Sequence, residues 1–182
     1  MFAGIIEVLI ITTLKISWIF NVYWVMAQSW VCLKYIVQPS PDGLDQAFIL
    51  GEDFIVDDDV CLGLGDNVNY GHDLTGLLTT GVQNAQSEKK ATVFGYHVYD
   101  PQQYGVAEFD DKGNVISNEE KPDKPKSNCA GTGLYFYPND VIQKAKKITP
   151  FYRGELEITS VYHAYLAEQR LKVELMGRGY VW

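Results

Sequence analysis

The sequence is poor in cysteine, and its charge is weighted toward acid. Its three cysteines, Cys32, Cys61 and Cys129, lie far apart without C-x-x-C or Cys/His ligand spacing, which argues against a disulfide framework and against a zinc site. Lys and Arg number 15 against 23 Asp and Glu, so the net charge is -8 and the basic surface of a non-specific nucleic-acid binder is missing. Any bound phosphate must be held locally, by a few cations, backbone amides or a metal ion.

Signatures of several catalytic classes are also missing. The sequence has no GxGxxG and no Walker motif, and His72, His97 and His163 have no partners that would build a Ser/His/Asp triad. An uncharged stretch over 16–31 contains three of the four tryptophans, but it is short for a membrane span and polar residues interrupt it. We therefore expect no membrane anchor.

Apolar runs of strand length alternate with helical patterns along the chain. The run 5–11 (IIEVLII) is typical of a buried parallel strand. Further strands are expected over 33–37, 60–67, 91–98, 131–137 and 171–177. Apolar residues at helical spacing predict a helix over 73–86 and two more between Val141 and Tyr165. This alternation predicts one α/β domain over 1–182, a Rossmann-like, mostly parallel sheet covered by helices on both faces.

Residues 104–122 interrupt this alternation with the pattern of a β-hairpin. Two alternating stretches flank Asp110-Asp111-Lys112-Gly113, where the glycine stands at a position that needs positive φ. Ligands of open α/β sheets bind outside the carboxyl ends of the strands. Polar, Gly-rich segments stand at those ends: QPSPDG (38–43), LGDN (64–67), YGV (104–106), EEKP (119–122) and GTGLY (131–135). Fold rule and composition thus predict the same binding cleft.

Several residues in these segments could carry chemistry. Asp66 follows an apolar strand, where a carboxylate can bind Mg²⁺ together with substrate phosphates, although a lone aspartate there is more often a turn or cap residue. Glu120 can accept hydrogen bonds from sugar hydroxyls beside Lys121, which can bind a phosphate, or the pair can form a solvated turn. Arg153, at a helix start, can bind an anion or merely cover the surface. Gln38 and its Pro-fixed loop allow a flat base to approach the backbone.

Taken together and in order, these segments resemble glucose-1-phosphate thymidylyltransferases. The resemblance extends from about Lys34 to Trp182 and includes QPSPDGLDQAFILGEDFI, LGDNVNYG, ATVFGYHVYDPQQYGVAEFD, EEKPDKPKSN, TGLYFY, RGELEIT and VELMGRGYVW. It implies a Rossmann-like nucleotidyltransferase fold and a Mg²⁺-dependent transfer of dTMP from dTTP to glucose 1-phosphate, which yields dTDP-glucose, a precursor of deoxysugars such as rhamnose, and pyrophosphate. It also implies a cytoplasmic homotetramer.

The resemblance carries over site residues one by one. It implies thymine contacts at Gln38, Asp42 and Gly43, and a metal-binding carboxylate at Asp66. It implies sugar contacts at Tyr104, Gly105, Glu120 and Lys121, with Tyr135 and Arg153 near the sugar phosphate. Of these, Asp66, Lys121 and Arg153 are the expected catalytic residues.

The sequence also departs from the family pattern. The family opens with a strand and the loop GGxGTRLxPxT, and it continues after GYVW into an LDTG segment with a second metal-binding aspartate. Neither segment lies within the sequence, so we expect a chain truncated at both ends that lacks the first βα unit. A catalytically inactive fragment, retaining at most nucleotide-sugar binding, is the alternative. Residues 14–31 match no family segment, and a frameshift is our hypothesis for them, because reading 24–31 one base earlier permits Gly-Asp-Gly-Ser.

Overall fold

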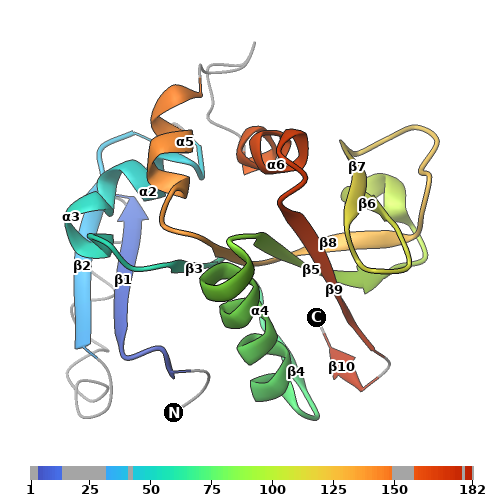
Figure 1. Cartoon of the computed structure of the whole chain (residues 1–182), viewed down its shortest axis with the longest axis horizontal. Helices are drawn as coiled ribbons and strands as arrows, with labels where there is room; N and C mark the ends of the chain where they lie inside the picture. The colour runs from blue at the N-terminus through green and yellow to red at the C-terminus, as the bar shows by residue number, and fades with distance from the viewer. Residues whose placement is uncertain (1–3, 14–31, 41–42, 149–157, 178, 182) are drawn as a thin grey trace.

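The computed structural model describes residues 4–13, 32–40, 43–148, 158–177 and 179–181, without the side chains of residues 158 and 159. Helices cover both faces of a central sheet (Figure 1). The expected α/β class, with both faces covered, is confirmed. The segment expected to be out of frame, 14–31, lies outside the described residues.

The central sheet has six strands. They are β3 (Val60–Gly63), β5 (Ala91–His97), β6 (Gly105–Phe109), β7 (Val115–Glu120), β8 (Cys129–Tyr137) and β9 (Leu171–Met176). Their spatial order is β7-β6-β8-β5-β9, and β3 pairs with β8 beside this path. Outside this sheet, β1 (Glu7–Thr13) pairs with β2 (Cys32–Gln38), and β4 (Tyr70–Gly71) pairs with β10 (Tyr180–Val181).

The direction of the strands corrects the expectation of a mostly parallel sheet. Among the described strands only β1–β2 and β5–β9 pair in parallel. β8 runs antiparallel to β3, β5 and β6, and β7 returns antiparallel to β6. β6 and β7 are antiparallel because a short hairpin turn joins them. The direction of β8 is set by its pairing with β3, β5 and β6, which all run opposite to it. An apolar run by itself carries no information on direction.

Each face of the sheet has its own layer of helices. One face is covered by α2 (Gln46–Leu50), α3 (Glu52–Ile55), α5 (Val141–Lys147) and α6 (Ile158–Ala167), and the other by α4 (Leu74–Glu88). Because side chains alternate along a strand, Tyr135 and Tyr137 of β8 pack toward α5 and α6, while Phe136 between them packs toward α4. The 3-10 helix η3 (Pro101–Gln103) directly precedes β6.

The central sheet curls until its two outer strands meet. The turn between β6 and β7 reaches β9, where the Val173 backbone N–H donates to the Gly113 carbonyl at 2.8 Å and Asn114 forms a bridge with Lys172. Gly113 has a φ of 76°, and a Cβ there would lie 2.9 Å from the Val173 carbonyl oxygen. Only glycine tolerates both conditions. The positive φ expected at Gly113 is confirmed, and the strands β7, β6, β8, β5 and β9 enclose a concave interior.

The strands β1 and β2 differ from the central ones. The run 5–11 was expected to be buried, yet Thr12 is the only buried residue of β1. Within the described residues the two strands pair only with each other, so less of their surface is covered than in the central sheet. None of the described helices is long and apolar enough to cross a membrane.

Candidate functional site

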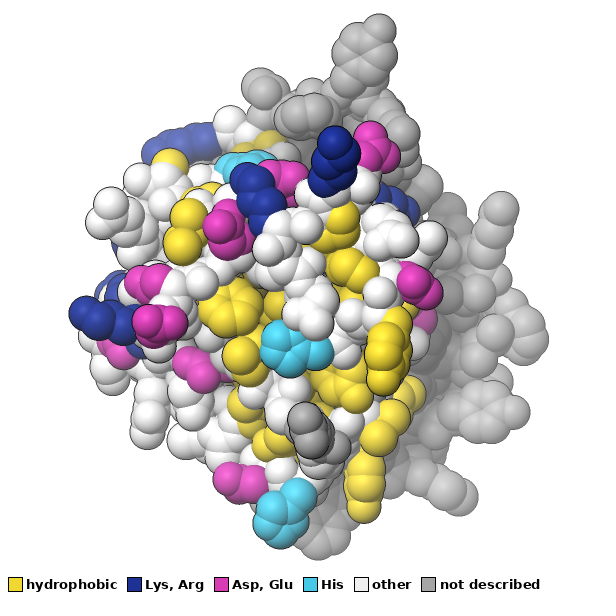
Figure 2. All heavy atoms as spheres, turned by 90° about the vertical axis from the view of Figure 1, so that its right-hand side faces the viewer, with side chains coloured by type: hydrophobic (Ala, Val, Ile, Leu, Met, Phe, Trp, Pro, Cys, Tyr) yellow, Lys and Arg dark blue, Asp and Glu magenta, His cyan; other side chains and the backbone are white. Residues whose placement is uncertain are grey.

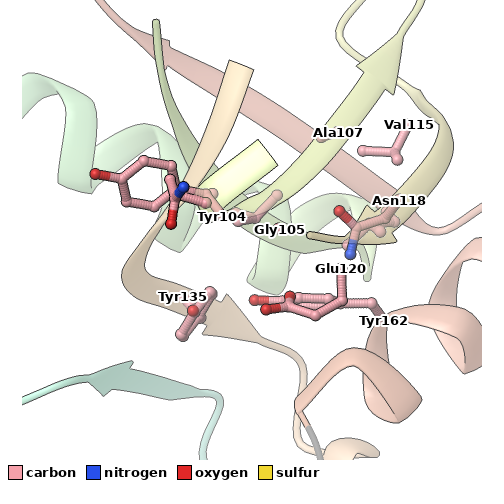
Figure 3. Close-up of a pocket in the computed structure, with 12 residues that line it drawn as sticks. Tyr104, Gly105, Ala107, Val115, Asn118, Glu120, Tyr135 and Tyr162 are labelled. Atoms are coloured by element: carbon pink, nitrogen blue, oxygen red, sulfur yellow. The ribbon is translucent and has the colours of Figure 1, made fainter. Parts of the chain in front are cut away.

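The concave side of the curled sheet contains a cavity of about 240 Å³ (Figure 3). Its floor consists of Val93, Ala107, Val115 and Leu171, which come from four different strands. Gly131 of β8 completes the floor, so each strand of the curl contributes one residue to it. Such a floor is apolar and suits the flat face of a small molecule rather than a charged group.

Polar side chains line the rest of the cavity. They are Gln103, Tyr104, Asn118, Glu120, Tyr135 and Tyr162. Together they offer one carboxylate, two amides and three phenol hydroxyls, which donate to and accept from hydroxyl groups. None of the described residues that line the cavity is a lysine or an arginine. The described lining therefore suits a hydroxyl-rich group.

Glu120 is held over the backbone of β6. A Cβ on Gly105 would lie 2.9 Å from the Glu120 Oε2, so glycine gives the carboxylate room to approach this strand. The two residues are directly opposite each other in the β6–β7 ladder. The next residue, Lys121, has a φ of 45°, and its backbone N–H donates to the Tyr104 carbonyl at 2.9 Å. A left-handed lysine is a strained conformation of the kind that clusters at functional sites.

Asp66 lies close to the same cavity. Burial raises the pKa of Tyr135; a hydrogen bond with Tyr162 acts to lower this pKa, and the charges of Glu120 and Asp66 act to raise it. The loop that carries Asp66 is tied to β8, because the Leu64 N–H donates to the Gly133 carbonyl at 2.8 Å. The Asn67 Nδ2 donates to the Asp66 Oδ1 at 2.8 Å, and the side chain of Asp66 is exposed. One carboxylate oxygen is thus oriented, and the other has open surroundings.

The expected base-binding residues form a second group at the end of β2. The Gln38 Nε2 donates to the Gly43 carbonyl at 3.3 Å and to the Gln46 Oε1 at 2.6 Å. Gly43 has a φ of 112°, which a residue with a side chain rarely adopts. These bonds fix the Gln38 amide at the end of β2. Asp42 and Arg153, the other expected site residues, lie outside the described residues.

The structure thus brings Tyr104, Gly105, Glu120 and Tyr135 together around one cavity, with Asp66 nearby. The sequence analysis missed Gln103, Asn118 and Tyr162. Asn118 had a usable signal, because it stands two residues before Glu120 on a predicted strand and so shares its face. Tyr162 belonged to an apolar helical pattern that did not distinguish a cavity wall from a core position.

The fit of a metal ion depends on Asp66. The described residues contain no group of three or more His, Cys, Asp or Glu side chains placed to hold a metal ion. The described residues therefore provide no site at which protein groups alone would coordinate a metal ion. A single oriented carboxylate still fits Mg²⁺, which keeps several waters and is often bound through one or two carboxylates and substrate phosphates.

The surface beside the cavity is mixed in charge. In Figure 2, which shows the side of the molecule that carries β6 and β7, Lys and Arg side chains lie next to Asp and Glu side chains. Glu119, in β7, forms an ion pair with Lys126 whose charged atoms are 2.7 Å apart. The described residues of this face form no separate basic stripe of the kind that tracks a nucleic-acid backbone.

Comparison with known proteins gives a consistent result. A protein-family model described as "Nucleotidyl transferase" matches residues 1–182. The chain is 52% identical over 150 residues to the glucose-1-phosphate thymidylyltransferase of Neisseria gonorrhoeae, covering 82% of the chain and 51% of the relative. It is 48% identical over 183 residues to that of Xanthomonas campestris pv. campestris strain B100, covering 100% of the chain and 61% of the relative. The chain thus spans about half to three-fifths of the length of these curated relatives.

Solved structures share the fold. One described as a glucose-1-phosphate thymidylyltransferase from Bacillus anthracis, in complex with a sucrose, matches with a TM-score of 0.79 and 32% identity over 94% of the chain and 68% of its own length. A UDP-glucose pyrophosphorylase complexed with UDP-glucose matches with a TM-score of 0.80 and 20% identity over 96% of the chain and 74% of its own length, which supports the fold alone.

Proposed function

The chain belongs to the nucleotidyl transferase family, and from this premise we propose that it acts as a glucose-1-phosphate thymidylyltransferase. In this reaction a phosphate oxygen of glucose 1-phosphate attacks the α-phosphorus of dTTP. The bond from the α-phosphorus to the bridging oxygen breaks, and pyrophosphate leaves with both electrons of that bond. In-line transfer of this kind depends on alignment and on neutralisation of charge more than on covalent help from the protein.

The observation that carries the proposal is a small cavity with an apolar floor and a rim of hydrogen-bonding side chains. About 240 Å³ lies just below the roughly 300–1,000 Å³ of pockets for drug-sized ligands, so the cavity suits one sugar ring rather than a whole nucleotide sugar. Its carboxylate, amide and phenol groups match sugar hydroxyls, with Glu120 accepting and Tyr104 and Tyr135 donating or accepting. The backbone of Gly105 allows the ring to lie close to β6.

The remaining substrate contacts are assigned to residues beside the cavity and to the residues at the end of β2. The phosphate of the sugar would lie outside the cavity, near Lys121 and Arg153. Gln38, Asp42 and Gly43 would contact the thymine base. Asp66 would be the protein ligand of Mg²⁺, whose charge stabilises the phosphates. A homotetramer and a cytoplasmic location also remain predictions from the resemblance.

Binding of sugar phosphate tests the proposal. We expect glucose 1-phosphate and dTDP-glucose to bind the chain in isothermal titration calorimetry. Glu120→Gln should weaken both about tenfold, because a hydrogen bond to a charged group is worth about 1.5–3 kcal/mol. Glu119→Gln is the matched control, since Glu119 is the neighbouring glutamate on the same strand but pairs with Lys126 rather than lining the cavity. Equal losses in the two variants, or no binding at all, would contradict the proposal.

Turnover is measured separately, as pyrophosphate released from dTTP and glucose 1-phosphate with Mg²⁺. Release that needs both substrates supports the full reaction. Binding without release supports the alternative from the sequence, an inactive fragment that retains nucleotide-sugar binding.

A further inference from the structure

The short helix α2 joins the end of β2 to the core. Its first residue, Gln46, accepts the hydrogen bond from the Gln38 Nε2 at 2.6 Å, and Phe48, two residues further on, is almost completely buried. α2 has only five residues, and a helix of this length is not stable by itself. The position of α2 therefore depends on what it contacts, at Gln38 on one side and in the core on the other.

Tyr137 of β8 is the core residue that α2 meets. The rings of Phe48 and Tyr137 are in edge-to-face contact, with centroids 5.3 Å apart, and Tyr137 is fully buried. Burial raises the pKa of Tyr137 well above the usual tyrosine range, and Tyr135 acts in the same direction. The Tyr162 hydroxyl acts to lower this pKa, and Asp45 acts to raise it. The Tyr137 hydroxyl thus lies within interaction range both of the residue directly before α2 and of two tyrosines that line the cavity.

The rings beside Tyr137 extend this contact to the cavity. The ring centroids of Tyr137 and Tyr135 are 6.3 Å apart, and those of Tyr135 and Tyr162 are 5.6 Å apart. Tyr135 and Tyr162 line the cavity (Figure 3), whereas Tyr137 is not among the described residues that line it. Side chains in a close-packed interior do not shift independently of their neighbours. A change in the position of α2 therefore reaches the cavity through Tyr137.

We propose that Tyr137 is a positioning residue that couples binding of the base at the end of β2 to binding of the sugar in the cavity. A ligand bound at Gln38 and Gly43 restrains α2, and α2 in turn holds Tyr137, which orients the hydroxyls of Tyr135 and Tyr162 toward the sugar. The second ligand then meets a cavity that is already ordered and binds more tightly. This inference rests on the proposed function, because it places a thymine base and a sugar phosphate at these two sites.

The test is isothermal titration calorimetry of glucose 1-phosphate with and without saturating dTMP. We expect dTMP to tighten glucose 1-phosphate about fivefold, and glucose 1-phosphate to tighten dTMP by the same factor, because coupling between two sites is reciprocal. Tyr137→Phe should reduce this factor to less than about twofold, while each ligand alone should bind within about twofold of its affinity for the unmodified chain. Repulsion between the two phosphates is the same in both proteins, so it does not affect the comparison.

Tyr165→Phe is the matched control. Tyr165 is also fully buried, and its ring centroid is 5.7 Å from that of Tyr137, but its hydroxyl donates to Asp140 at 2.6 Å, away from the cavity lining. We expect this variant to keep the fivefold coupling. A purely structural role of Tyr137 would change Tm and leave the coupling factor as it is, so thermal unfolding of both variants separates stability from coupling.

The outcomes separate the two proposals. If both ligands bind the unmodified chain without coupling, if Tyr137→Phe keeps the coupling, or if Tyr165→Phe loses it equally, the positioning role is wrong while the proposed function stands. If glucose 1-phosphate binds but dTMP does not, the positioning role fails together with the base contacts at the end of β2, and the sugar cavity stands. If glucose 1-phosphate does not bind the unmodified chain, the proposed function fails and the inference fails with it.

Discussion

The two faces of the central sheet are both covered by helices, but they are packed with different side chains. Under α4, the face is filled by Phe94, Phe136 and Met176, with Phe94 and Phe136 in edge-to-face contact at 5.9 Å between centroids. α4 approaches so closely that a Cβ on its Gly81 would lie 2.7 Å from the ring of Phe136. This face contains no polar atom that the cavity uses, and its contribution is stability.

The opposite face contains a row of four tyrosines. Tyr162, Tyr135, Tyr137 and Tyr165 follow one another with ring centroids 5.6, 6.3 and 5.7 Å apart. Burial raises the pKa of Tyr137 and Tyr162 well above the usual tyrosine range, so both remain protonated. The Tyr162 hydroxyl lies near enough to those of Tyr135 and Tyr137 to interact with both, but among the described residues neither the Tyr137 nor the Tyr162 hydroxyl reaches full hydrogen-bond geometry. This face therefore carries polar atoms at a cost in stability, and the cavity lies on it.

The largest expected effect is on the packed face. Phe136→Ala should lower the free energy of unfolding by about 3–5 kcal/mol, since it removes a buried aromatic ring and leaves a cavity against α4. Urea unfolding followed by circular dichroism measures this. Ile116→Ala is the control, because that side chain is 57% exposed and should change stability by less than about 0.5 kcal/mol. A loss below about 1 kcal/mol at Phe136 would show that the two faces do not differ as described.

An intermediate effect of opposite sign is expected on the tyrosine face. Tyr137→Phe and Tyr162→Phe should each raise the free energy of unfolding by about 1 kcal/mol, because each removes a buried hydroxyl without a well-formed hydrogen bond. Only Tyr162 lines the cavity, so only Tyr162→Phe should also weaken glucose 1-phosphate, by about fivefold. Urea unfolding and calorimetry on both variants separate the two effects. Destabilisation of both would show that these hydroxyls are already satisfied.

The smallest effect is expected at the outer end of the tyrosine row. Asp140 accepts hydrogen bonds from the Tyr165 hydroxyl at 2.6 Å and from Arg170 at 2.7 Å. Burial acts to raise the pKa of Asp140, but the hydrogen bonds from Arg170 and Tyr165 outweigh it, and the net pKa is below the ordinary 3.8. A carboxyl with a lowered folded pKa stabilises the fold above its ordinary value, and that contribution is lost as the pH falls further.

Asp140→Asn should therefore destabilise the chain at pH 7 by no more than about 1 kcal/mol, because 39% of the side chain is exposed. The difference from the unmodified chain should shrink as the pH is lowered from 5 toward 3. Thermal unfolding across this range measures it, with Asp111→Asn at an exposed position as the control. A difference that stays constant with pH would exclude the ion pair as its source.

Local patterns predicted the elements of both faces well. The helix expected over 73–86 corresponds to α4, the strands expected over 91–98 and 171–177 correspond to β5 and β9, and the hairpin turns at Gly113. The predictions of these elements succeeded because alternation, helical spacing and turn chemistry act over a few neighbouring residues. Tyr104, Glu120 and Tyr135 line one cavity, but only Glu120 ends a strand, since Tyr104 precedes β6 and Tyr135 lies inside β8.

Properties that depend on distant segments were not predictable in the same way. The direction of β8 is decided by pairing with three other strands, and the role of Tyr162 depends on the sheet curling beneath α6. A Cβ at Gly95 or Gly133 would clash with a neighbouring side chain and one at Gly131 would not, a difference that depends on atoms brought there by the fold. Residues 14–31, together with Asp42 and Arg153, stay predictions from the sequence.

The contact between Gly113 and Val173 has a consequence for biosynthesis. The two residues are about 60 positions apart, so at roughly 5–20 residues per second the hairpin is synthesised several seconds before β9 exists. During that interval the hairpin has no outer strand to meet, and pairing over such a separation is intrinsically slow. The cavity is therefore completed only after β9 has been synthesised, and a ligand that binds it recognises only chains whose synthesis has passed β9.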